Sequence, residues 1–162
     1  PIVIKVLKSE FPSSKQIVQL KNELDYTTKV DVAGIRKGYK RIKINNRHAL
    51  LLEYFDGCSI KEAIKQKLFD LRSFLEIAIE ISEVLGEIHQ KNIIHKDLNS
   101  NNILVDFSKK SIRIIDFGMA VNMDLKNQKL ESPETLEGTI AYISPEQTGR
   151  MNRVVDYRSD LY

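Results

Sequence analysis

Apolar and polar positions follow two different periods along the chain, which predicts a mixture of β-strands and α-helices. Strand-length apolar runs occur at residues 2–7, 35–44, 49–54, 93–94, 103–105 and 112–115. Asn45 and Asn46 stand between the second and third of these runs and predict a turn, and Gly57 predicts a break after the third. The pattern therefore predicts short strands that alternate with helices.

Two stretches carry the spacing of three and four residues that is typical of amphipathic helices. Ser13 and Ser14 can cap a helix that runs to about Val30, whose apolar face is formed by Ile17, Leu20, Leu24 and Thr27. The clearest helix covers residues 71–90, and the residues expected on its buried face are Phe74, Ala78, Ile81, Leu85 and Ile88. Residues 119–136 are polar and have no period, which predicts a surface loop of the kind that often carries function.

A polar loop, HKDLNSNN at residues 95–102, lies between two strongly apolar runs. Because buried strands hold both of its ends, the loop is expected to be a rigid mount for its side chains. Such a mount can keep Asp97 and Asn102 at a fixed separation, which catalysis by positioning requires.

Composition limits the classes of protein that fit. The 162 residues suffice for one domain with a core, and 42% hydrophobic and 29% charged residues are ordinary for a globular protein. The net charge of +3 is small and its lysines and arginines are spread along the chain, which argues against nucleic acid as a partner. No apolar run approaches the roughly 20 residues of a membrane span, and no signal peptide is evident. Cys58 is the only cysteine, so an intrachain disulfide is excluded and a cytoplasmic location is predicted.

Three chemical signals occur in order: Lys5 within an apolar strand, Asp97 within the polar loop, and the tripeptide Asp116-Phe117-Gly118 after a strand. Each alone is weak. A lysine in a strand is usually solvent-facing, an aspartate in a polar loop is usually a turn former, and a bare tripeptide occurs by chance. Their order and spacing together are less expected of unrelated loops.

From residue 2 onward the chain resembles the eukaryotic-type serine/threonine protein kinases. IVIK at 2–5 stands where that family has V-A-I-K, and the 95–102 loop stands where it has H-R-D-L-x-x-x-N. DFG follows at 116–118, and GTIAYISPEQ at 138–147 resembles the end of an activation segment, with S-P-E in place of A-P-E. The resemblance implies an α+β, two-lobed protein-kinase-like fold. Residues 1–54 would be part of the smaller lobe and residues 55–162 part of the larger one. Because the chain begins with Pro1 and ends at Tyr162, we expect a fragment, incomplete at both ends and inactive alone.

The resemblance also implies an ATP site with Mg²⁺. Lys5 would contact the α- and β-phosphates and Glu23 would pair with Lys5. Asp97 would be the catalytic base that accepts the proton of the substrate hydroxyl. Asn102 and Asp116 would hold Mg²⁺, to which hard oxygen ligands are suited.

Further positions follow from the same resemblance. Leu52 would stand at the back of the adenine site, the backbone of Glu53 and Phe55 would hydrogen-bond adenine, and Leu104 would pack beneath the ring. Thr139 would contact the catalytic aspartate and shape the groove for a protein substrate.

Supporting roles are implied for three more residues. His95 would pack against Phe117, Asp160 would accept backbone hydrogen bonds from the 95–102 loop, and Glu146 would pair with an arginine beyond Tyr162. His48 and His89 have no such context and are interpreted as surface or helix-flank residues.

The stretch at 144–162 also resembles kinase domains at the N-terminus of very large bacterial signalling proteins, which carry a P-loop ATPase, a GAF sensor and a histidine kinase.

Two departures from the family pattern affect this interpretation. Lys96 replaces the usual arginine, which leaves control by phosphorylation at Ser132, Thr135 or Thr139 open. Asn99 replaces a lysine common in serine/threonine kinases, so a charge near the γ-phosphate is missing.

Two alternative functions stay open. One is a pseudokinase or nucleotide-binding scaffold, against which the retained residues Lys5, Asp97, Asn102 and Asp116 argue. The other is a small-molecule phosphotransferase, against which the 138–147 segment argues.

Overall fold

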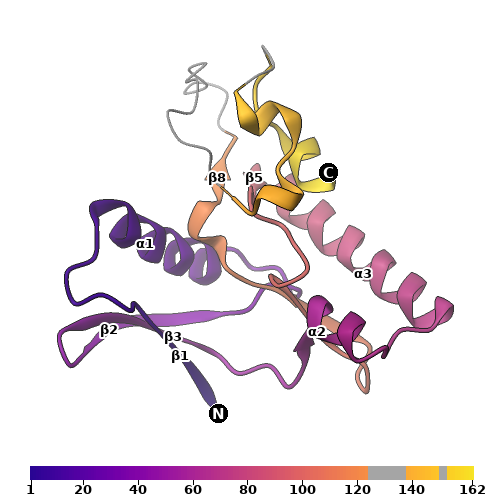
Figure 1. The fold of residues 1–162 in the computed structure, drawn as a ribbon, viewed down its shortest axis with the longest axis horizontal. Helices are drawn as coiled ribbons and strands as arrows, with labels where there is room; N and C mark the ends of the chain where they lie inside the picture. The colour runs from indigo at the N-terminus through magenta and orange to yellow at the C-terminus, as the bar shows by residue number, and fades with distance from the viewer. Residues whose placement is uncertain (124–137, 150–152) are drawn as a thin grey trace.

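A three-stranded antiparallel sheet covered by one helix forms the first part of the chain. The computed structural model describes residues 1–123, 138–149 and 153–162. Strands β1 (Ile2–Val6), β2 (Gly38–Ile44) and β3 (Arg47–Glu53) pair in the order β1-β3-β2. Asn45 and Asn46 form the predicted turn between β2 and β3, and both have positive φ, 46° and 63°. Helix α1 (Ser14–Lys29) lies along this sheet (Figure 1).

A capping box sets the start of α1, and the helix has the predicted bounds. The Ser13 side chain accepts a hydrogen bond from the Gln16 backbone N–H, and the Gln16 side chain accepts one from the Ser13 backbone. Val30 is the C-terminal cap. The buried face includes Leu20 and Thr27 of the predicted stripe, and Glu23 is buried beside them.

The second predicted strand begins later than expected, at Gly38 instead of residue 35. Ile35 is buried and forms a parallel bridge with Ile114, a residue of the other sheet. Gly34 packs so closely on the helix that contains Val84 that an added Cβ would lie 2.2 Å from Val84 Cγ2. The apolar residues at the start of this run therefore serve a second core, which a strand pattern alone could not reveal.

The second part combines short strands with two helices. Strands β4 (Cys58–Ser59), β6 (Ile103–Asp106) and β7 (Ser111–Ile114) form an antiparallel sheet in the order β4-β6-β7. Strand β5 (Ile93–Ile94) pairs with β8 (Val121–Asn122). Helix α2 (Ile60–Lys65) follows β4, and α3 (Leu71–Gln90) runs the length of this part (Figure 1).

The bounds of α3 are those predicted, but its buried face is not. Phe74 was expected in the core but is 53% exposed, and its ring contacts Phe69 edge-on. The buried side chains of the helix are Ile77, Val84, Leu85 and Ile88. The buried face of α3 is therefore rotated about the helix axis relative to the predicted one, since Ile77 and Val84 are buried and Phe74 is not.

Buried apolar side chains form two clusters among the described residues. The smaller consists of Leu20, Leu50 and Leu52, between α1 and the first sheet. The larger cluster lies beneath α3 and around the second sheet, and it includes Ile88, Ile112 and Phe117. Val32 and Ile35 also belong to the larger cluster, so the segment after α1 ties the two parts together.

Single turns of 3₁₀ helix complete the described chain: Phe117–Met119, Ile140–Tyr142, Pro145–Thr148 and Tyr157–Leu161. The last of these stands where a central helix was expected to begin, and in this structure it has 3₁₀ geometry. Most of the predicted surface loop, with Ser132 and Thr135, lies outside the described residues. No helix in the described parts of the chain is long and apolar enough to cross a membrane.

Candidate active site

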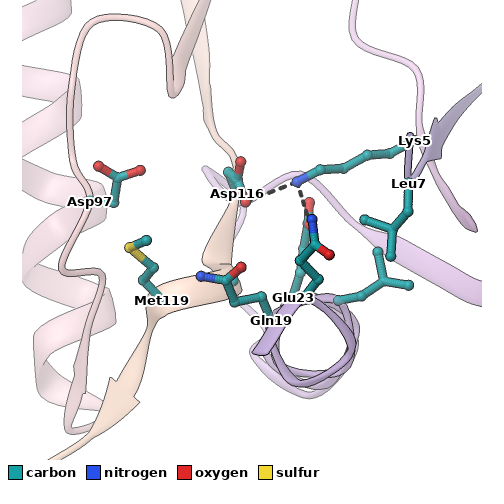
Figure 2. Close-up of a pocket in the computed structure, with 10 residues that line it drawn as sticks. Lys5, Leu7, Gln19, Glu23, Asp97, Asp116 and Met119 are labelled. Atoms are coloured by element: carbon teal, nitrogen blue, oxygen red, sulfur yellow. Dashed lines mark hydrogen bonds and ion pairs between the residues drawn. The ribbon is translucent and has the colours of Figure 1, made fainter. Parts of the chain in front are cut away.

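A cleft of about 210 Å³ opens between α1, the first sheet and the segments around Asp97 and Asp116. Its charged lining residues are Lys5, Glu23, Asp97 and Asp116. Figure 2 shows Lys5 reaching across from β1 toward Glu23 and Asp116, with Asp97 on the opposite wall. Four residues separated by up to 111 positions in sequence thus meet in one place.

Lys5 makes two ion pairs within this cleft. Its Nζ lies 2.6 Å from Glu23 Oε2 and 2.9 Å from Asp116 Oδ1. Burial of the ammonium group opposes its charged form, but the nearby carboxylates of Glu23 and Asp116 outweigh burial and raise the pKa of Lys5. Lys5 is therefore held as a cation and directed toward Asp116.

Glu23 is the most enclosed of the four charged residues. It is 2% exposed and lies on the inner face of α1. Burial raises the pKa of Glu23, and the ion pair with Lys5 opposes that rise. The ion pair with Lys5 therefore favours the charged form of the buried Glu23 carboxyl group.

Asp116 is held in an unusual backbone conformation. Its φ and ψ are 67° and 62°, in the left-handed region that residues other than glycine seldom adopt. The next residue, Phe117, is fully buried, and its ring contacts His95 edge-on with centroids 4.7 Å apart. The predicted packing of His95 on Phe117 is confirmed. Anchoring of Phe117 keeps the strained Asp116 in the cleft.

Asp97 is surrounded by hydrogen-bond donors. Both the backbone N–H and the hydroxyl of Thr139 donate to Asp97 Oδ1, each at 2.9 Å. The Asn102 amide donates to the Asp97 carbonyl oxygen at 2.9 Å and to Oδ2 at 3.2 Å. The carboxylate is thus fixed by residues on two different segments.

Asn99 adds a third set of contacts that the sequence did not indicate. Its amide donates to the Asp97 carbonyl oxygen at 3.0 Å and lies 3.3 Å from Asp97 Oδ1. It also donates to the Thr139 hydroxyl oxygen at 3.1 Å. Asn99 therefore links Asp97 to Thr139 without adding a charge.

His95 is a structural residue in a single tautomer. The Asp97 backbone N–H donates to His95 Nδ1 at 3.3 Å, so Nδ1 carries no proton. The proton is then on Nε2, which lies 3.0 Å from the carbonyl oxygen of Ile115 and donates to it. Burial of the ring lowers the pKa of His95, and the charge of Asp160 only partly opposes this effect. His95 therefore stays neutral and joins the Asp97 loop to the strand before Asp116.

Asp160 anchors the same loop from the other side. Its carboxylate accepts the backbone N–H groups of His95, at 2.8 Å, and Lys96, at 2.9 Å, which confirms the predicted contacts. His89 Nε2 lies 2.9 Å from Asp160 Oδ2 and its ring packs near Tyr157. His89, interpreted as a surface or helix-flank residue, lies in the last turn of α3, and its contact with a partner 71 positions away was not indicated by the sequence.

Gln147 supports the loop at its most strained point. Lys96 has a φ of 65°, and the Gln147 amide donates to its carbonyl oxygen at 2.8 Å. Gln147 is buried and also closes a capping box with Ser144. The Ser-x-x-Gln spacing could have indicated the capping box but not the contact with Lys96. Nearby, Glu146 accepts a hydrogen bond from the Ser159 hydroxyl at 2.5 Å.

The residues predicted around adenine do not line this cleft. Leu52 is buried in the smaller cluster, and Leu104 lies on β6, partly exposed. Glu53 ends β3, and its backbone N–H donates to the Lys37 carbonyl oxygen at 2.8 Å. Phe55 follows it, with the guanidinium of Arg113 5.1 Å above the centre of its ring.

Comparison with known proteins places this arrangement in a family. The protein kinase domain matches residues 1–162, the whole of the chain. A probable serine/threonine-protein kinase of Clostridium perfringens is 28% identical over 99% of this chain and 23% of its own length. PknB of Lactococcus lactis is 29% identical over 99% of this chain and 25% of its own length, and PrkC of Bacillus subtilis is 24% identical over 99% and 24%.

The chain spans about a quarter of the length of these three relatives. Its fold is the mixed helix and sheet arrangement that the family match implies, with a cleft where Lys5, Glu23 and Asp116 converge. Since the match extends over every residue, the chain belongs to the protein kinase domain family.

Proposed function

We propose that this chain is the catalytic part of an ATP-dependent protein kinase that phosphorylates serine or threonine. The observation that carries the proposal is the cleft in which the Lys5–Glu23 ion pair and Asp116 face Asp97 (Figure 2). This set of charged groups is suited to phosphate chemistry, because each group can take a different role. Lys5 can bind phosphate, Asp116 can bind a metal ion and Asp97 can take a proton.

Phosphate binding is assigned to Lys5. Its partner Glu23 is buried and fixed on α1, so the ammonium group is aimed into the cleft. The α- and β-phosphates of ATP would take the position beside Lys5 that Asp116 now occupies. At the other end, the backbone of Glu53 and Phe55 would bind adenine, with Leu52 behind the ring and Leu104 beneath it.

Proton transfer is assigned to Asp97. The substrate hydroxyl oxygen forms a bond to the γ-phosphorus, the bond from that phosphorus to the β-phosphate bridging oxygen breaks, and the hydroxyl proton passes to Asp97. Thr139 and Asn99 hold the Asp97 carboxylate by hydrogen bonds. This arrangement lowers the barrier mainly by orienting the hydroxyl group.

Asn102 and Asp116 fit a magnesium ion. The Asn102 amide nitrogen is turned toward Asp97, which leaves its oxygen for another ligand. Hard oxygen donors suit Mg²⁺, which is usually held by one or two protein ligands together with substrate phosphates. Within the described ranges no three His, Cys, Asp or Glu side chains form a metal site, so the phosphates would complete the coordination. The ion would neutralise charge on the β- and γ-phosphates.

The setting of this activity is also proposed. Residues 1–54 would form part of the smaller lobe and residues 55–162 part of the larger lobe, with ATP between them. The resemblance of residues 144–162 to kinase domains of large bacterial signalling proteins suggests that P-loop ATPase, GAF and histidine kinase domains accompany it. A cytoplasmic location supports access to ATP and to protein substrates.

The test is phosphate incorporation by the intact protein with labelled ATP, Mg²⁺ and a general protein substrate, followed by identification of the phosphorylated residue. We expect phosphoserine or phosphothreonine, and loss of incorporation in Asp97→Asn. Asp31→Asn is the matched control, since Asp31 is exposed. Nucleotide binding without transfer would indicate a pseudokinase, and transfer to a small molecule but not to protein would indicate the other alternative.

A further inference from the structure

An arginine on β7 contacts the segment that joins the two parts of the fold. We call residues 53–57 the hinge segment, because they link β3 to β4. The Arg113 guanidinium carbon lies 5.1 Å from the centre of the Phe55 ring. Arg113 Nε lies 3.5 Å from Glu53 Oε2. One side chain thus contacts two residues of the hinge segment from 58 or more positions away in sequence.

The position of Arg113 on its strand places it beside the expected floor of the adenine site. Arg113 pairs with Leu104 across the antiparallel β6 and β7 strands. Paired residues in such a ladder present their side chains on the same face of the sheet. Arg113 therefore lies next to Leu104 and spans from there to the hinge segment.

Close packing holds the hinge segment on the same sheet. A Cβ added at Gly57 would lie 2.6 Å from Phe55 Cε1 and 2.5 Å from the Val105 carbonyl oxygen. The Phe55 ring therefore packs close to both Gly57 and Arg113. The Glu53 carboxylate is fixed as well, because the Lys37 backbone N–H donates to it at 3.2 Å.

Partial burial strengthens both Arg113 contacts. The side chains of Arg113 and Glu53 are 24% and 25% exposed, so water screens their charges only in part. Arg113 Nε is buried and has no hydrogen bond within the described parts of the chain, which leaves Glu53 as its charge partner. A planar guanidinium can stack on an aromatic ring while it faces a carboxylate, which the ammonium group of a lysine does poorly.

We propose that Arg113 is a positioning residue of the nucleotide site, which fastens the hinge segment to the β6–β7 sheet so that the adenine-binding backbone and Leu104 keep a fixed separation. This inference rests on the proposed binding of ATP. It concerns a residue that touches no reacting atom, so its effect should fall on nucleotide affinity and not on the rate of transfer.

The experiment compares the intact parent protein with Arg113→Met, which keeps an unbranched apolar stem, and with Arg113→Lys, which keeps the charge. Arg72→Met is the matched control. It makes the same chemical change and breaks an ion pair to Glu76 at 3.1 Å on the outer surface of α3. Binding of ATP and of adenosine is measured by calorimetry. The KM for ATP and kcat are measured by phosphate incorporation. Amide exchange of the hinge segment is measured by mass spectrometry in the absence of nucleotide.

For Arg113→Met we expect binding of both ATP and adenosine to weaken by about three- to tenfold, with kcat within about twofold of the parent. The two ligands should be affected equally, because the change acts at the adenine end. Amide exchange of residues 53–57 should be faster in Arg113→Met. Arg113→Lys should fall between the parent and Arg113→Met, and Arg72→Met should match the parent.

Two results would overturn the inference while leaving the proposed function in place. One is unchanged adenosine binding and hinge exchange in Arg113→Met. The other is a loss for ATP but not for adenosine, which would mean that Arg113 acts on phosphate charge. A parent protein that binds neither ligand would overturn the proposed function together with the inference. A lower melting temperature with unchanged ligand affinities in the folded protein would assign Arg113 to stability alone.

Discussion

Replacement of Asp160 by alanine is expected to loosen the loop that carries Asp97. The Asp160 carboxylate accepts three hydrogen bonds, from the backbone N–H groups of His95 and Lys96 and from the His89 ring. Its side chain is fully buried. Alanine at this position leaves the two backbone donors without partners, because neither has another acceptor among the described residues.

The expected cost follows from these contacts. A buried donor without a partner costs about 1–3 kcal/mol, so two of them lower the free energy of unfolding by about 2–6 kcal/mol. The His89 ring is partly exposed and can bind water, so it adds little. Asp160→Asn keeps an oxygen for His95 and His89 but turns an amide group toward the Lys96 N–H, which orphans one donor and costs about 1–3 kcal/mol.

Urea unfolding of the intact protein at neutral pH measures these differences, and steady-state kinetics on the same samples measures the consequence for Asp97. We expect kcat to fall by about 10- to 100-fold in the alanine variant, since small displacements of a positioned group are costly. Asp156→Ala is the control. Asp156 is in the same segment but pairs locally with Arg158, so its loss should cost about 1 kcal/mol or less. An Asp160→Ala variant within about 0.5 kcal/mol of the parent would refute the reasoning.

Three further substitutions test other contacts of the site. Lys5→Met should abolish measurable transfer and also destabilise the fold at pH 8, because the buried Glu23 carboxylate loses its cation. The double variant with Glu23→Gln should recover stability but not activity, and recovery of transfer would contradict the assigned role. His95→Phe should flatten the pH dependence of stability. In the parent, only the unfolded chain binds a proton at this residue below about pH 6.5, so stability falls with falling pH by up to about 1.4 kcal/mol per unit. A parent equally stable in urea at pH 5 and pH 7 would argue against a buried neutral His95. Asn99→Leu should lower kcat about tenfold without changing KM for ATP, and should cost less when Thr139→Ala is already present. Additive effects in this cycle would mean that Asn99 acts independently of Thr139.

Elements specified by neighbouring residues were predictable from the sequence. The N-terminal ends of α1 and α3 are set by capping boxes between residues three positions apart, and both helices have the predicted bounds to within a residue. The late start of β2 and the rotated face of α3 were not predictable. They depend on Ile35 meeting Ile114 and on Phe74 meeting Phe69, and these contacts exist only in the folded chain.

The candidate site divides in the same way. Lys5, Asp97 and Asp116 were identified by spacing and by resemblance to a family, and the structure brings all three to one cleft. Their roles remain predictions until activity is measured. The contacts of Asn99 with Thr139 and of Gln147 with Lys96, which help to fix the site, have no local signal because the partners lie 40 and 51 positions apart.

The charge balance of the cleft has a consequence for the order in which ligands can enter. Three carboxylates and one ammonium group line it, and that ammonium group is already shared between Glu23 and Asp116. Free ATP, itself an anion, would therefore meet repulsion and a lysine that is occupied. Asp116 would hold a divalent cation that accompanies the nucleotide, and Lys5, with one partner fewer, would then bind the phosphates. The unliganded protein is thus expected to discriminate strongly against metal-free ATP. Lys5 becomes accessible to the phosphates only when Asp116 binds the cation, so the cation and the nucleotide each need the other for full access to the cleft.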